Sequence, residues 1–534
     1  MTRLRFLLAA VALAGAAQPA VAQHAQVSPY IEATQVLAAD LGDGSDVFTY
    51  TTVGAGIDAA LDSRRVQVQV SYKYEHRFSY DKQLADEDMH TGLAQARATV
   101  APGLTLEAGA IAAHARADVR GDASLTGQGN VRNRSQVFSA YAGPNLATHV
   151  GPAFVNAAYR FGYTKVEAPD ATGVPAGQPA LDRYDDSRVH VATASVGVKS
   201  GQVLPVGITA SGSYTREDAG QLDQRFEGKF GRGDVVLPVG RGFALTAGVG
   251  YEQIEISQRD ALRDGAGNPV VDRNGRFVTD PASPRRIAYD FDGIFWDAGV
   301  IWRPSRRTFL EARVGRRYDS WSYTGSFSYQ MGRGSGIQVG VYDNVQTFGQ
   351  QLSGTLATLP TSFISTTDPF GNQFGGCIYG TTGAAAGGCL NQVFASTVTT
   401  AYRGRGIVGV AVANTGRSRF GIGAGYSRRT FIAPSTASVG GIRIDGSSDD
   451  ALFAQFFASE DVGTSGVLST AVFGSWYNSS LPGAEGILGY GANTSYTHNF
   501  GPLGATASLG VFGFERDGDS SAQAQALVGL RYGF

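Results

Sequence analysis

The chain of 534 residues has little charge, only two cysteines and no excess of basic residues. Charged residues make up 17%, which is low for the surface of a soluble protein. The mean hydropathy of -0.10 is also too low for a helical membrane protein, and after residue 22 no uncharged apolar run is long enough to cross a bilayer as a helix. A net charge of -2 and a pI of 6.4 disfavour nucleic-acid binding, because a phosphate backbone attracts basic surfaces. The chain therefore fits neither an ordinary soluble protein nor a helical membrane protein.

The first 22 residues have the three-part pattern of a secretory signal peptide. Arg3 and Arg5 precede the apolar run 6–14, and small residues occupy 20–22. The apolar run is shorter than the ~20 residues that a spanning helix needs. We therefore expect cleavage after Ala22 and export of one domain, residues 23–534.

The dominant pattern beyond the signal peptide has a period of two. Within 65–78 the apolar Val66, Val68 and Val70 alternate with polar residues, and the run 47–61 is long enough for one extended strand. Tight Pro- and Gly-containing turns alternate with long connections, and this alternation predicts one short-turn rim and one long-loop rim. The long connections are 120–133, 169–186, 259–286, 351–398 and 434–447.

These two rims are typical of an outer-membrane β-barrel, whose short turns face the periplasm and whose long loops face outward. We predict an all-β, antiparallel transmembrane barrel of about 22 strands, one of which spans 335–351. Counts of 18 or 20 stay open because 307–319 and 322–333 are the least regular strands. The principal extracellular loops are expected at 259–286 and 351–398. An even count places both chain ends in the periplasm of a Gram-negative cell.

The C-terminus ends on an alternating aromatic strand. This ending resembles the signal that outer-membrane barrels present to the barrel-assembly machinery, although an ordinary last strand would have the same alternation. Outer-membrane lipid is the other expected partner. The residues of the expected signal are Val528, Leu530, Tyr532 and Phe534.

The segments 292–308 and 311–318 resemble the beta-barrel porin type 2 family. More narrowly, they resemble outer-membrane proteins that accompany exopolysaccharide and exosortase systems, and the similarity is clearest over 240–350. The resemblance implies an outer-membrane barrel linked to polysaccharide export or envelope assembly. It implies no catalytic residue, because the family has no established active-site motif.

Motifs for catalysis or cofactor binding are not found. The seven histidines lack metal-ligand spacing, and no nucleophile elbow, zinc-protease or phosphate-loop motif occurs. We therefore predict no enzyme activity, no metal and no cofactor. The segment 272–275 lacks the ligands of a calcium loop, and a small hairpin with turns at 264–265 and 274–275 explains it better.

The two cysteines, Cys377 and Cys389, lie in the longest connection. The periplasm is oxidising, so these isolated thiols are predicted to form a disulfide. The bond could brace a loop folded into or over the pore, or staple a surface loop. The sequence leaves both readings open.

Charged residues on single strand faces are predicted to face the lumen, because a basic side chain on the lipid face costs about 2 to 4 kcal/mol at the midplane. They could brace the interior as ion pairs or line a solute path. Because each strand face carries charges of both signs, bracing by ion pairs is slightly favoured over a selective solute path. The candidates are Lys73, Glu75, Arg77, Arg225, Glu227, Lys229, Glu311, Arg313 and Arg317.

We interpret the protein as a porin-like channel or exopolysaccharide-associated export component, with polysaccharide or small solutes as cargo. The alternative is a structural or assembly-linked barrel with a closed lumen. An uptake receptor would need a plug domain before the barrel, yet strand pattern begins by Val27. An outer-membrane enzyme is disfavoured because no catalytic constellation is present.

Overall fold

The computed structural model describes 24–42, 46–80, 86–118, 133–167, 181–332, 334–364, 370, 374–381, 385–397, 399–434, 438–439, 442–481, 483–484, 486–516 and 519–534. The predicted signal peptide, residues 1–22, lies outside these ranges, as do most of the predicted connections 120–133 and 169–186. No helix in the described part is long and apolar enough to span a bilayer.

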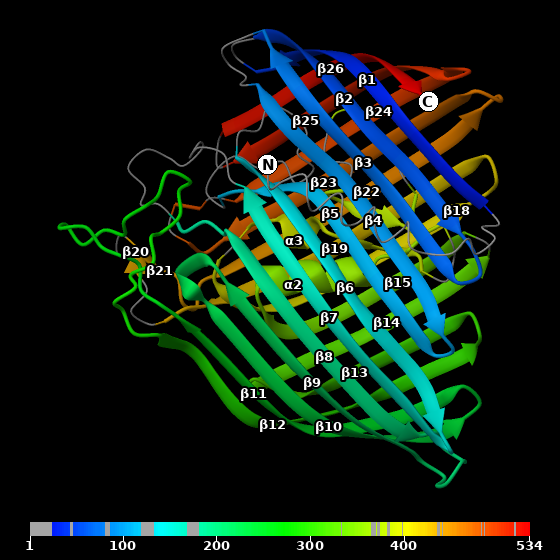
Figure 1. The fold of residues 1–534 in the computed structure, drawn as a ribbon, viewed down its shortest axis with the longest axis vertical. Helices are drawn as coiled ribbons and strands as arrows, with labels where there is room; N and C mark the ends of the chain where they lie inside the picture. The colour runs from blue at the N-terminus through cyan, green and yellow to red at the C-terminus, as the bar shows by residue number, and fades with distance from the viewer. Residues whose placement is uncertain are drawn as a thin grey trace.

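A closed sheet of 22 antiparallel strands forms the wall (Figure 1). The last strand pairs with the first from Tyr30–Gly533 to Asp40–Gln523, so the sheet has no free edge. The first eleven strands are β1 (His24–Asp40), β2 (Val47–Asp62), β3 (Val66–Ser79), β4 (Glu87–Ala101), β5 (Leu104–Arg116), β6 (Arg134–Val150), β7 (Ala153–Glu167), β8 (Asp186–Val198), β9 (Gly207–Ala219), β10 (Arg225–Gly240) and β11 (Phe243–Gln258). The others are β12 (Arg286–Ser305), β13 (Thr308–Arg317), β14 (Ser320–Gly332), β15 (Ser335–Gln346), β18 (Ala401–Asn414), β19 (Ser418–Ile432), β22 (Ser448–Val462), β23 (Gly466–Ser479), β24 (Ile487–Phe500), β25 (Leu503–Arg516) and β26 (Asp519–Gly533).

The fold is therefore the predicted outer-membrane β-barrel, and the 22-strand count is confirmed. The two least regular strands are present as β13 and β14. The predicted strand 335–351 is too long, because β15 ends at Gln346 and a helix begins at Phe348. Thr347 caps this helix, since its side chain accepts a hydrogen bond from the Gln350 amide.

The short-turn rim depends on glycines with positive φ. In the β4–β5 turn Gly103 has a φ of 81°, and a Cβ there would lie 2.4 Å from the Ala147 carbonyl oxygen. Only glycine suits this turn without strain. Because the turns at this rim are short, the long connections lie at the opposite rim.

Apolar side chains cover the outer face of the wall. Leu509, Val528 and Ile294 are 68%, 66% and 73% exposed on the isolated chain, and their position on the outside of a closed sheet is where lipid contacts them. Val528, Leu530 and Tyr532 of the predicted assembly signal alternate along the outer face of β26 and pair in register with β1 and β25. Phe534 follows the strand, and its amide donates to the Pro29 carbonyl at 3.0 Å.

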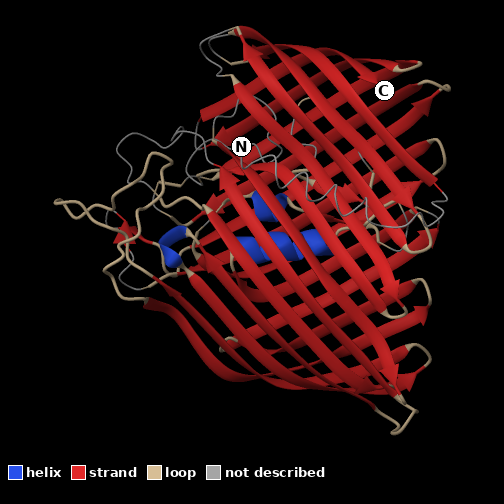
Figure 2. Cartoon of the chain, viewed as in Figure 1, coloured by secondary structure: helices blue, strands red, loops and turns tan. Residues whose placement is uncertain are grey.

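The connection between β15 and β18 contains the helices that lie inside the ring (Figure 2). It comprises α2 (Phe348–Thr358), β16 (Cys377–Tyr379), β17 (Gly387–Cys389) and α3 (Asn391–Phe394). We call residues 347–397 the inner segment. Small elements outside the wall are η1 (Gln221–Asp223), β20 (Ser438–Val439) and β21 (Ile442–Arg443).

Candidate functional site: the occluded lumen

Helix α2 packs one face against the inner side of the wall. Phe348, Leu352 and Leu356 recur every four residues and are fully buried, so they form one apolar stripe along the helix. This stripe joins Leu93 and Val137 of the wall in a single hydrophobic cluster. The helix is therefore fixed to strands β4 to β8 by packing as well as by polar contacts.

The cysteines join β16 to β17 in a disulfide inside the lumen. The pair lies on Gly423 of β19, where a Cβ would come 2.2 Å from the Cys377 Sγ. A Cβ at Gly421 or Gly425 would likewise lie 2.7 Å from an inner side chain, Tyr379 and Gln392 respectively. Close packing thus accounts for this glycine run, and the disulfide belongs to a segment folded into the pore.

Three glutamines on the inner face of the wall bind the backbone of the inner segment. Gln69 donates to the Phe363 carbonyl at 2.7 Å and accepts from the Phe363 amide at 2.8 Å. Gln95 donates to the Leu356 carbonyl at 2.9 Å, and Gln455 accepts from the Cys377 amide at 3.0 Å. Sequence reasoning missed these residues, although each occupies the inward parity of its strand.

Two charged groups of the wall add further anchors. The Glu217 carboxylate accepts a hydrogen bond from the Thr347 hydroxyl at the start of α2. Across the lumen, Arg429 makes an ion pair with Asp449 at 2.6 Å and donates to the Ser396 hydroxyl at 3.0 Å. Because Arg429 and Asp449 are 4% and 2% exposed, this pair is shielded from solvent screening.

Six of the nine predicted lumen residues face inward, and the contacts are ion pairs. Lys73 lies 3.1 Å from Glu32 and 3.0 Å from Glu75, while Arg77 pairs with Glu87. The third predicted group centres on Arg313. Its guanidinium lies 2.6 Å from Glu311, 2.7 Å from Asp234 and 3.0 Å from Asp297, and Arg317 pairs with Glu252 at 2.5 Å. This arrangement matches the bracing interpretation, because every cation is paired and both Lys73 and Arg313 are shared between carboxylates.

The placement of Arg225, Glu227 and Lys229 in the lumen is wrong. Phe226 pairs in register with Glu217, which touches α2, so the even-numbered residues of β10 face inward. The three charged residues therefore lie on the outer face near the long-loop rim, in exposed pairs such as Lys229–Glu227 at 2.7 Å. The lipid-face penalty did not apply there, because these positions lie close to the rim and away from the bilayer midplane.

The long connections meet at Asp182, which lies just before β8. Its carboxylate accepts hydrogen bonds from the Gln221 side chain and, at 2.9 Å, from the Phe277 amide, so it joins three connections. Desolvation raises the pKa of Asp182 to about 7 despite these donors. A small cavity of about 60 Å³ adjoins it, bordered by Thr399 of the inner segment's exit.

The connection 259–286 forms successive turns, and Asp264 and Asp272 accept hydrogen bonds from the amides that follow them. Across the described ranges, no group of three His, Cys, Asp or Glu side chains could hold a metal ion.

The fold is that of an outer-membrane β-barrel, and the described part of the inner segment packs inside its lumen. Among solved structures, the siderophore receptor PiuA of Acinetobacter baumannii matches 94% of this chain and 82% of its own, with 8% identity and a TM-score of 0.42. The ferric-catecholate import receptor Fiu of E. coli K12 matches 95% and 81%, with 9% identity and a TM-score of 0.40. OccAB4 of Acinetobacter baumannii matches 97% and 100%, with 9% identity and a TM-score of 0.28. These values are too low to transfer a site or a function.

No protein-family model matches the chain, and no curated protein matches its sequence. The resemblance to beta-barrel porin type 2 proteins and the exopolysaccharide link therefore stay hypotheses.

Proposed function

We propose that the protein is a gated outer-membrane channel, closed in this conformation by its own inner segment. The observation that carries the proposal is the set of polar anchors between this segment and the wall, at Gln69, Gln95, Glu217, Arg429 and Gln455. Barrels of 22 strands are wide enough to need a plug. Hydrogen bonds to side chains can be exchanged for water, so such a segment can move while the wall stays intact.

We propose small hydrophilic solutes or polysaccharide as cargo. The inner faces of β24 and β25 support this choice, because their side chains are polar and uncharged: Asn493, Ser495, Thr497, Thr506 and Ser508. Asn493, Ser495 and Ser508 are buried in the closed conformation and would become accessible when the inner segment moves. Such a wall suits hydroxyl-rich solutes, since it offers hydrogen bonds without a charge barrier. The polysaccharide option also has the resemblance of segments 292–308 and 311–318 as support.

A structural barrel with a permanently closed lumen is the second candidate. The ion pairs around Arg313 and the buried cluster at α2 favour it, because both stabilise a filled interior. Export through a signal peptide cleaved after Ala22 and folding by the barrel-assembly machinery are common to both candidates.

Single-channel recording of the refolded protein in a planar bilayer tests the proposal. We expect long closed periods interrupted by discrete conductance steps. A variant in which a short Gly-Ser linker replaces residues 350–396 should conduct continuously, which controls for insertion. If the linker variant conducts and the full chain stays silent at every voltage and pH, the structural barrel is correct. Liposome swelling with neutral and charged sugars of matched size then identifies the cargo class.

A further inference from the structure

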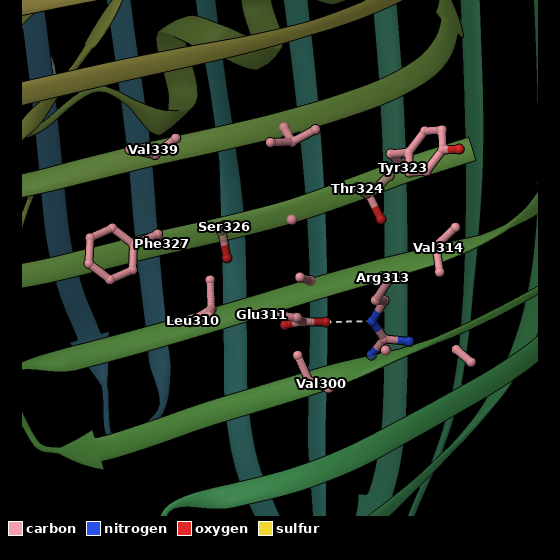
Figure 3. Close-up of a pocket in the computed structure, with 15 residues that line it drawn as sticks. Val300, Leu310, Glu311, Arg313, Val314, Tyr323, Thr324, Ser326, Phe327 and Val339 are labelled. Atoms are coloured by element: carbon pink, nitrogen blue, oxygen red, sulfur yellow. Dashed lines mark hydrogen bonds and ion pairs between the residues drawn. The ribbon is translucent and has the colours of Figure 1, made fainter. Parts of the chain in front are cut away.

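An apolar groove of about 510 Å³ runs along the outer face of β12 to β15 (Figure 3). Its floor consists of Ala298, Ala312 and Gly325 on three neighbouring strands: Ala312 and Gly325 are register partners, and Ala298 lies one outward position along β12 from Val300, the partner of Ala312. The small floor residues explain the depth of the groove. Its walls include Val300, Leu310, Val314, Tyr323, Phe327 and Val339.

Aromatic side chains bound the groove at both ends. Trp296 and Trp321 contact each other edge to face at 6.2 Å toward the long-loop rim, and Trp302 lies toward the short-turn rim. Three of the four tryptophans in the chain are thus on the outer face of two strands. Tryptophan prefers the boundary between hydrocarbon and headgroups, so these residues place the groove within the bilayer.

Arginines lie immediately beyond the groove on the long-loop side. Arg316 is the next outward residue after Val314, and it has no ion pair with any residue that the structure describes. On the far side of the groove, β18 pairs with β15, and Ile407 is the register partner of Val341. Arg405 is the next outward residue of β18 toward the long-loop rim. Arg405 pairs directly with Arg428 across β18 and β19. Like charges in such a position repel each other unless an anion lies between them.

Nearby carboxylates are already engaged. Asp343 binds Arg403 through both oxygens, at 2.8 and 2.7 Å, and lies 3.6 Å from Arg405. Asp450, opposite Arg428, accepts the Tyr426 hydroxyl at 2.6 Å. On β15, β18 and β19, Arg403, Arg405 and Arg428 therefore outnumber Asp343 and Asp450 by one positive charge. On the other side of the groove, Asp292 and Asp319 are exposed at the rim near Arg316.

We propose that this groove and its arginine edge bind a phosphorylated, multiply acylated glycolipid of the outer leaflet, with lipid A as the representative compound. An acyl chain fills the apolar groove, and a phosphate lies between Arg405 and Arg428, with Arg316 as a further contact. The edge carries the long connections, which outer-membrane barrels turn outward, so it meets the leaflet in which such glycolipids reside. Glu311 and Arg313 of β13 also border the groove, and the proposal does not depend on gating of the lumen.

Native mass spectrometry of the full chain in detergent, titrated with lipid A, tests the proposal. The wild type should retain one lipid A per chain, at least tenfold more tightly than phosphatidylglycerol. The double variant Arg405→Ala/Arg428→Ala should weaken binding about 25-fold, from about fivefold per arginine near a membrane surface. Arg188→Ala is the matched control, because Arg188 is an exposed outward residue at the same rim on β8. It should bind as the wild type does.

A second variant tests the groove without changing charge. Ala312→Phe fills the groove from its floor, whereas Ala507→Phe adds the same ring at an exposed outward position on β25. Only Ala312→Phe should lose lipid A, and heat-modifiable gel mobility shows that every variant is folded. The proposal is overturned if the wild type binds no lipid A, or if it binds phosphatidylglycerol as tightly as lipid A. It is also overturned if the variants and their controls lose lipid A equally. A lipid-free dimer that covers this face would overturn it as well.

Discussion

The Thr347 hydroxyl donates a hydrogen bond to the buried Glu217 carboxylate of β9. The same hydroxyl accepts the Gln350 amide at 3.2 Å, so one side chain both starts α2 and ties it to the wall. The carboxylate also lies at the helix N-terminus, where the backbone amides and the helix dipole favour an acceptor. This contact couples the fold of the inner segment to its position in the lumen.

Thr347→Val should make the channel open more often. The substitution removes the helix cap and the donor to Glu217, and a lost cap alone costs about 1 kcal/mol. The ratio of open to closed time should therefore rise about fivefold or more in single-channel recordings. Thr358→Val is the control, because Thr358 at the other end of α2 is exposed and donates only to the Thr355 carbonyl. Identical open times in both variants would contradict a role for this contact in gating.

Loss of the disulfide should also loosen the inner segment. Cys377 and Cys389 are 12 residues apart in sequence, and a link of this kind contributes about 2 to 4 kcal/mol of local stability. Reductant, or the double substitution Cys377→Ser/Cys389→Ser, should lengthen open events. Reductant must have no further effect on the double variant, and unchanged gating in both experiments would show that packing on Gly423 suffices.

The hydrogen-bonded junction of the three connections at Asp182 should lose stability as pH rises. Its pKa is raised to about 7 in the folded protein, whereas an ordinary aspartate titrates near 4, so the folded state binds the extra proton between these values. The stabilisation is complete below pH 4 and is lost as pH rises through about 7. Protection factors of 259–285, which divide out the intrinsic rise of amide exchange with pH, should therefore be lower at pH 8 than at pH 5.

Asp182→Asn should abolish this pH dependence. Asp264→Asn is the control, because amide hydrogen bonds lower the pKa of Asp264 and it titrates below this range. A pH dependence that survives in Asp182→Asn would assign the effect to another group.

Arg313→Ala should destabilise the barrel by about 1 to 3 kcal/mol, because it leaves Glu311, Asp234 and Asp297 with fewer donors. The measurement is the urea midpoint of unfolding in lipid vesicles. Arg225→Ala, on the outer face, should change the midpoint little, since exposed ion pairs contribute little. A change in ion selectivity without a change in stability would instead support a solute-lining role for Arg313.

Deletion of Phe534 should reduce the folded fraction in the outer membrane several-fold. Phe534 is 73% exposed on the outer face and contacts Tyr532 at 5.2 Å, so a recognition protein can reach it. The heat-modifiable band in isolated membranes measures folded protein. Leu509→Ala removes a comparably exposed outer residue and should leave that band unchanged; equal losses would indicate general destabilisation.

Local pattern was enough to predict the wall. Alternating residues and turn signals placed strand 448–462 at the bounds of β22, because strand geometry follows from each residue's immediate neighbours. The pattern also showed that Arg313 and Glu311 share one face. It did not identify which face of β10 meets the lumen, because charge near the rim is tolerated on either side.

The sequence by itself determined the outer-membrane barrel, a count of 18 to 22 strands and the presence of a long cysteine-containing connection. Only the tertiary structure decided that this connection fills the lumen. Its anchors join residues far apart in the chain, as Gln69 and Phe363 do, and such contacts leave no local periodicity. The lipid-facing groove has a related origin: Ala298, Ala312 and Gly325 look ordinary in three separate strands, and the register of the antiparallel pairs β12–β13 and β13–β14 brings them together.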